Sequence, residues 1–135
     1  MTVSWRKDYE KYPCTEEDIN TRRRIYDFNL QGYKCSMRRA SSGFWFAIIR
    51  IPYDHPYVQN LDAIYLKVHG GITSRSRLSR SILFDCGRGL DISPLCIDRM
   101  NEKGVEISKL FRYRDYNFMQ REIYSAVKQL EILRY

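Results

Sequence analysis

Apolar and polar side chains alternate along residues 33–39, as they do in a strand with one buried face. Residues 44–51 are apolar at almost every position, which is typical of a central strand covered on both faces. Residues 40–43, Ala-Ser-Ser-Gly, fit a turn between the two. The pattern predicts a β-hairpin in which the side chains of residues 33–39 form two sets, Tyr33, Cys35 and Met37 on one face and Lys34, Ser36 and Arg38 on the other.

A second strand pair is predicted further along the chain. Residues 64–69 alternate, with Ile64, Leu66 and Val68 on one face and His69 at the end of the opposite face. Residues 81–86 alternate in the same way, and we expect the two segments to pair antiparallel. The Ser/Arg-rich residues 73–80 between them have no apolar face to bury, so they are predicted to form a mobile loop.

Three helices are predicted. Residues 15–18 fit a capping box, which favours a helix over residues 16–28 that ends at Gln31 and Gly32. Residues 94–101 fit a short helix that begins with a proline. Residues 116–133 carry the clearest amphipathic pattern, and the positions expected to pack on the sheet are Met119, Ile123, Val127, Leu130 and Leu133.

Together these elements predict an α+β fold in one domain over residues 1–135. An antiparallel sheet of four or five strands would pack against the long C-terminal helix and the N-terminal helix. A chain of 135 residues is long enough to bury a core of this kind. Residues 1–13 lack periodicity and are expected to be irregular.

The net charge of +7 and the pI near 9.3 favour an anionic partner, which would be nucleic acid, a nucleotide or an acidic protein surface. A basic surface that serves solubility alone is the competing interpretation. The longest apolar run, residues 44–49, is too short to span a bilayer, and residues 1–8 lack the apolar segment of a signal peptide. We therefore expect a cytoplasmic protein with no membrane partner.

Neither a metal nor another cofactor is expected. The four cysteines include no C-x-x-C pair, and no His-x-His or His-x-x-x-His spacing occurs. Cys35 fits a small buried hydrophobic residue. Cys86 as a nucleophile would need a lowered thiol pKa, which Arg88 is close enough in sequence to favour.

The anion-binding hypothesis rests on glycines and arginines near the predicted strand ends. Backbone N–H groups exposed at a Gly-Gly turn can hold an oxyanion, and arginine suits two-pronged capture of phosphate. Arg88 lies between two glycines, and the tyrosines offer surfaces for base stacking. The predicted binding residues are His69, Gly70, Gly71, Arg75, Arg77 and Arg88, with His55 in a supporting role.

The alternative is a small hydrolase that acts on a phosphate-containing substrate. His69 would be its acid–base group, and Asp85 or Asp91 would orient the imidazole. A structural module that binds an acidic protein is a third possibility.

Several short motifs resemble a group of small uncharacterised bacteriophage proteins. The motifs include Val-His-Gly-Gly-Ile-Thr at residues 68–73 and Phe-Asp-Cys at residues 84–86. The likeness extends over about residues 32–133, through further motifs at residues 32–35, 51–56, 61–64 and 113–116.

In that group Phe-Asp-Cys is followed by a histidine and then an aspartate. Here Arg88 takes the place of the histidine and Asp91 is kept, which favours a basic binding pocket over a His-dependent enzyme or a metal site. The resemblance implies a phage protein that acts in a host cell, with no established activity. We therefore expect a non-enzymatic counter-defence protein that inhibits a host nuclease or CRISPR-type complex, or sequesters a nucleotide signal.

Overall fold

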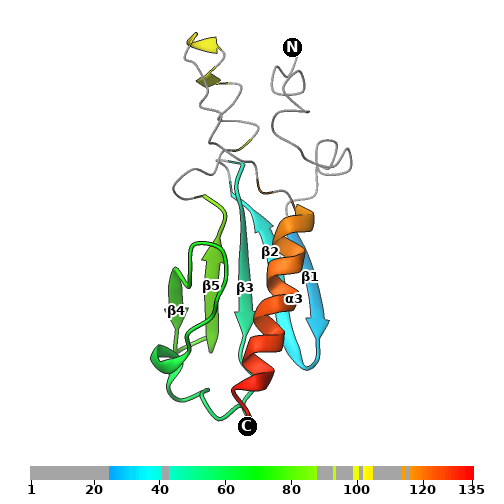
Figure 1. Cartoon of the computed structure of the whole chain (residues 1–135), viewed down its shortest axis with the longest axis vertical. Coiled ribbons are helices and arrows are strands. Elements are labelled where there is room, and N and C mark those ends of the chain that lie inside the picture. The colour runs from blue at the N-terminus through cyan, green and yellow to red at the C-terminus, as the bar shows by residue number, and fades with distance from the viewer. Residues whose placement is uncertain are drawn as a thin grey trace.

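The structure is a computed structural model that describes residues 25–40, 43–87, 93, 99–100, 102–104, 114 and 116–135. Within them, five strands form one antiparallel sheet, in the order β1-β2-β3-β5-β4. A long helix packs across it (Figure 1). The elements are β1 (Ile25–Leu30), β2 (Tyr33–Arg39), β3 (Trp45–Arg50), the short 3-10 helix η2 (Leu61–Ala63), β4 (Ser74–Ser76), β5 (Ser81–Asp85) and α3 (Tyr116–Ile132).

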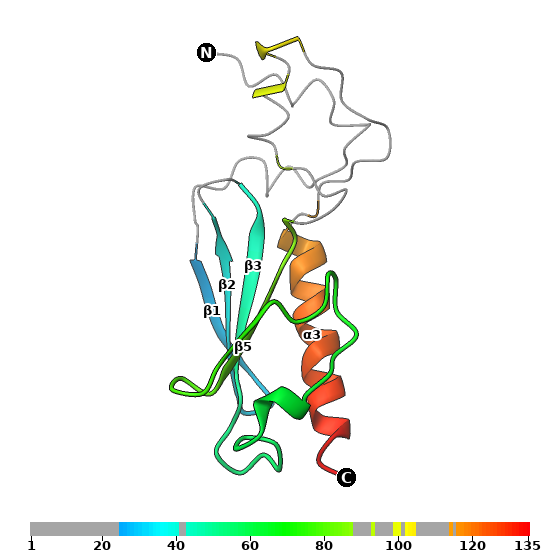
Figure 2. The ribbon, with the colours of Figure 1, turned by 90° about the vertical axis from the view of Figure 1, so that its left-hand side faces the viewer.

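The molecule has two layers. The sheet forms one, and α3 forms the other together with the chain between β3 and β4 (Figure 2). We call the sheet face toward α3 the inner face and the opposite one the outer face. Within the part of the chain that the structure describes, no helix lies on the outer face.

The inner face and α3 enclose the core. The predicted stripe on α3 is confirmed, because its first four members are buried and Leu133 is partly buried. The β2–β3 hairpin and the strand near residues 81–86 are confirmed as well. Cys35 is a buried core residue, as predicted, and burial raises the pKa of its thiol to about 11. On β3, by contrast, Phe46 and Ile48 are only half-buried, since they point to the outer face.

The prediction of a helix through residue 28 is wrong for its last turn, because residues 25–30 form β1. Tyr26, Phe28 and Leu30 alternate with polar residues and pack against the core. Gln31 and Gly32 both have positive φ angles, 51° and 87°, as in a two-residue type I′ hairpin. Gly32 therefore closes a strand turn and does not end a helix. Residues 1–24 lie outside the described residues, as does nearly all of the predicted helix 94–101.

The predicted strand at residues 64–69 is also wrong. This segment is extended, but it lies beside α3 and pairs with none of the strands that the structure describes. Gln129 on α3 bonds both the N–H (2.7 Å) and the carbonyl (3.0 Å) of Lys67, in the manner of a neighbouring strand. The partner of β5 at the sheet edge is instead β4, inside the Ser/Arg-rich segment predicted to be a loop. Of the three residues predicted to share a face, Ile64 and Leu66 are buried and Val68 is partly buried.

Removing the side chains that hold this segment is expected to loosen it without unfolding the sheet. In a Glu122→Ala/Gln129→Ala variant, the amides of Lys67 and His69 lose their acceptors, each worth about 1 kcal/mol. Hydrogen exchange at those amides should become about tenfold faster. Lys128→Ala, an exposed change beside Gln129, is the control. Unchanged exchange in the double variant would show that other contacts hold the segment.

Candidate anion-binding site

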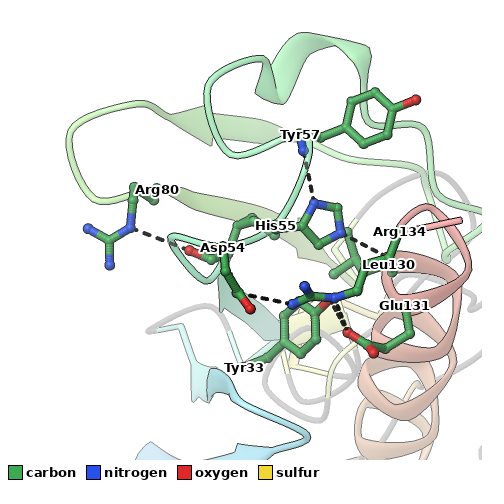
Figure 3. A network of polar contacts seen from close by, with 9 residues as sticks. Tyr33, Asp54, His55, Tyr57, Arg80, Leu130, Glu131 and Arg134 are labelled. Carbon is green, nitrogen blue, oxygen red and sulfur yellow. Dashed lines mark hydrogen bonds and ion pairs between the residues drawn. The ribbon is translucent and has the colours of Figure 1, made fainter.

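His55 is buried in the core, with 2% of its surface exposed. Its Nδ1 accepts a hydrogen bond from the backbone N–H of Tyr57 (3.0 Å), and its Nε2 lies 2.8 Å from the carbonyl oxygen of Leu130 (Figure 3). Because a backbone amide can only donate, Nδ1 is the acceptor and Nε2 carries the proton that is donated to Leu130. Nδ1 thus fixes the loop after β3 in its own conformation, and Nε2 links that loop to the last turns of α3.

A polar network surrounds this link (Figure 3). The hydroxyl of Tyr33 and the Nε of Arg134 both donate to Oε1 of Glu131, at 2.6 and 2.8 Å, and Arg134 also reaches Asp54 at 3.3 Å. The bonds from Tyr33 and Arg134 lower the pKa of Glu131. Burial and the bond to Glu131 raise the pKa of Tyr33. The network joins β2, the loop after β3 and the C-terminal end of α3.

His69 lies beside the N-terminal half of α3. Its backbone N–H donates to Oε1 of Glu122 (2.7 Å), and its ring meets the Phe118 ring edge-on, with centroids 5.4 Å apart. The imidazole is half-buried in this position. His69 and His55 therefore sit near opposite ends of α3.

The Gly-Gly pair forms a tight turn. The N–H of Gly71 donates to the carbonyl of Val68 (2.9 Å), and Gly70, with a φ of 71°, takes the third position, where a type II turn favours glycine. The Gly71 N–H that we expected to hold an oxyanion is thus a donor within the turn. A Cβ at Gly70 would lie 3.7 Å from the carbonyl oxygen of Asp85, so the turn rests against the end of β5.

The carboxylate of Asp85 accepts hydrogen bonds from two neighbouring segments of the chain. Its Oδ2 accepts from the hydroxyl of Thr73 (3.1 Å) and its Oδ1 accepts from the N–H of Gly87 (3.0 Å). Its alternative in the hydrolase hypothesis, Asp91, lies outside the described residues. Cys86 is 1% exposed, so its thiol is out of reach of a substrate. Within the described ranges, no three His, Cys, Asp or Glu side chains are grouped so that they could hold a metal.

The arginines of the predicted loop have partners within the chain. Arg75 donates to the carbonyls of Leu61 (3.1 Å) and Ile64 (2.8 Å), which fixes the segment around η2. Arg77 forms an exposed ion pair with Asp62 at 3.2 Å. Arg88 lies outside the described residues. Arg75 pairs across the sheet with Ile82 near the start of β5, whereas Gly70 lies against its end, so the predicted residues are spread along the strand.

A different group of cations gathers on the outer face. Lys34 on β2 lies directly opposite Arg50 on β3, and Arg38 follows Lys34 on the same face of β2, about 13 Å along the strand. We call Lys34, Arg38 and Arg50 the basic face. They line an open hollow of about 400 Å³, and its other lining residues include Asp27, Asn29, Ser36 and Ile48.

The pairing of Lys34 with Arg50 is unfavourable in the protein alone. Side chains directly opposite each other on neighbouring antiparallel strands have Cβ atoms about 5 Å apart, and like charges there repel. Neither side chain has a carboxylate partner among the residues that the structure describes. Asp27 lines the same hollow, but it leaves a net positive charge. A bound anion would relieve this repulsion.

Part of the basic face could be predicted from the sequence. Alternation in residues 33–39 placed Lys34 and Arg38 on one face, away from the predicted core side. What it lacked was the register that sets Arg50 opposite Lys34, since register depends on the turn between the strands.

Comparisons give no further assignment. No protein-family model, curated protein or solved structure matches the chain significantly. In the described part of the chain, no helix is both long and apolar enough to cross a membrane. The resemblance to phage proteins therefore stays a prediction.

Proposed function

We propose that the protein is a non-catalytic binding protein that captures a phosphate-containing anion on its basic face. The observation that carries the proposal is the opposed pair Lys34 and Arg50, two cations on adjacent strands with no carboxylate partner in the described chain. Arginine and lysine are the side chains that bind phosphate most readily, and this hollow is open to solvent.

The setting that we propose is phage counter-defence. It rests on the motif resemblance, and the net charge of +7 supports an anionic target. Such a protein would inhibit a host nuclease or CRISPR-type complex by occupying its nucleic-acid partner, or would sequester a nucleotide signal.

A Lys34→Ala/Arg50→Ala variant tests the site. With inorganic polyphosphate as the probe, we expect the dissociation constant to rise at least about tenfold. The slope of log K against log salt should fall by about two, because each lost phosphate contact removes about one. Titration calorimetry at several salt concentrations measures both quantities. Asp27→Asn removes the negative charge from the same hollow and should tighten binding.

The control is Lys103→Ala/Lys128→Ala, which removes the same charge from two exposed positions elsewhere. If both double variants weaken binding equally, net charge alone explains it and the proposed site is wrong. Hydrolysis of nucleotides by the wild-type protein, lost in His69→Ala, would favour the hydrolase alternative instead.

A further inference from the structure

A stacked pair, Tyr53 and Arg80, lies next to the basic face. The guanidinium carbon of Arg80 is 3.5 Å from the centroid of the Tyr53 ring, a close cation–π contact. Tyr53 is nevertheless 76% exposed, so much of this aromatic side chain faces solvent. A planar pair that is exposed in this way offers a stacking surface for another flat group.

The backbone fixes the position of this pair. Arg80 has a φ of 54°, a conformation that non-glycine residues rarely adopt, and its carbonyl accepts a 2.6 Å hydrogen bond from Ile51. The Nε of Arg80 donates back to the carbonyl of Ile51 at 3.4 Å (Figure 3). The turn before β5 and the end of β3 are thus tied together, which holds Arg80 over Tyr53. Backbone strain of this kind is frequent at binding sites.

The pair and the basic face form one continuous surface. Tyr53 and Arg80 line a second hollow of about 280 Å³, and Lys34 and Arg50 line both hollows. Four cations therefore extend from Arg38 to Arg80, and an exposed ring lies at one end. A single phosphate would occupy only a small part of this length, since Arg38 and Lys34 alone are about 13 Å apart.

We propose that this surface binds single-stranded nucleic acid, with the backbone phosphates on Lys34, Arg38 and Arg50 and a base stacked on the Tyr53–Arg80 pair. Sites for single strands combine a basic surface with aromatic side chains, and bases also stack on guanidinium planes. A duplex keeps its bases stacked inside and would leave Tyr53 unused. The inference rests on the proposed function and adds the class of the ligand.

Tyr53→Ala separates stacking from charge. For a fluorescent oligothymidine strand, we expect the dissociation constant to rise about tenfold in fluorescence anisotropy, because stacking on an aromatic ring contributes strongly to such binding. Affinity for inorganic polyphosphate should not change. Tyr53→Phe keeps the ring and should bind the strand as the wild type does. The matched control is Tyr65→Ala, which removes an equally exposed tyrosine (81%) from the segment beside α3.

Three outcomes would overturn the inference. Oligothymidine binding that is unchanged in Tyr53→Ala would show that no base stacks there. Equal competition by a DNA duplex would point to charge alone, and failure of the wild type to bind any oligonucleotide would exclude nucleic acid as the ligand. If polyphosphate binding still requires Lys34 and Arg50 in any of these cases, the proposed function stands and only the nucleic-acid assignment fails.

Discussion

His55→Ala is expected to lower the free energy of unfolding by about 3 kcal/mol. The substitution leaves the N–H of Tyr57 and the carbonyl of Leu130 without their partner in a region that is closed to water. The Leu130 carbonyl lies where α3 ends, and the N–H of Arg134, its normal helical partner, bonds Glu131 instead. Removing the ring also opens a cavity beside Tyr33, whose ring it meets edge-on.

The other histidine of the chain is the natural control. His69 is half-buried, and its hydrogen bond to Glu122 comes from the backbone, so His69→Ala keeps that bond. We expect a loss of about 1 kcal/mol or less from the missing contact with Phe118. Urea unfolding followed by circular dichroism measures both variants. Equal losses would mean that the two imidazoles play similar roles, contrary to the geometry.

The sequence predicted the elements whose apolar pattern matches their final surroundings. The stripe on α3 and the alternation in β2 and β5 were predicted correctly, because the apolar face of each of these elements packs against the core. Residues 25–30 were missed because a capping box upstream favoured a helix, although Tyr26, Phe28 and Leu30 alternate as a strand does. The capping box favoured a helix and the alternation favoured a strand. In the structure, the type I′ turn at Gln31 and Gly32 joins residues 25–30 to β2 as a strand.

Residues 64–69 show a second reason why the fold could be predicted only in part. Their alternation is genuine, because Ile64 and Leu66 are buried and Tyr65 is exposed. The backbone of Lys67 and His69, however, is bonded by the side chains of Gln129 and Glu122, more than fifty residues away. Alternation with a period of two predicts an extended backbone, but it does not predict which groups form hydrogen bonds with that backbone.

The candidate site was missed for a related reason. The sequence drew attention to glycines and arginines that lie close together in the chain, yet one of these arginines, Arg75, is engaged by the carbonyls of Leu61 and Ile64. The basic face is assembled across strands, from Lys34 and Arg50, sixteen positions apart. Such a pair becomes visible only once the register is known.

Glu131→Ala is expected to cost about 2 kcal/mol at neutral pH and clearly less at low pH. Two donors, the Tyr33 hydroxyl and the Arg134 guanidinium, converge on this carboxylate, and hydrogen bonds to a charged group are stronger than neutral ones. Part of the side chain is exposed (32%), so solvent screening reduces the total. The same bonds lower the pKa of Glu131 in the folded state.

The direction of the pH dependence follows from that lowered pKa. Because the folded protein holds the proton of Glu131 less tightly than the unfolded chain does, the carboxylate stabilises the fold fully above the ordinary pKa of about 4.5. This contribution is lost as the pH falls from there through the folded pKa. The difference in stability between the wild type and Glu131→Ala should therefore shrink steadily below about pH 5.

Glu131→Gln distinguishes the charge from the hydrogen bonds. Its amide oxygen can still accept from Tyr33 and Arg134, so we expect this variant to keep part of the stability at neutral pH. It cannot titrate, and its unfolding curves between pH 3 and pH 7 should lack the contribution from Glu131. A difference between wild type and Glu131→Gln that stays constant over that range would contradict the lowered pKa. The network of Tyr33, Glu131 and Arg134 would then stabilise the fold through packing and neutral hydrogen bonds. In that case the contact that this network makes between β2 and α3 would be insensitive to acid.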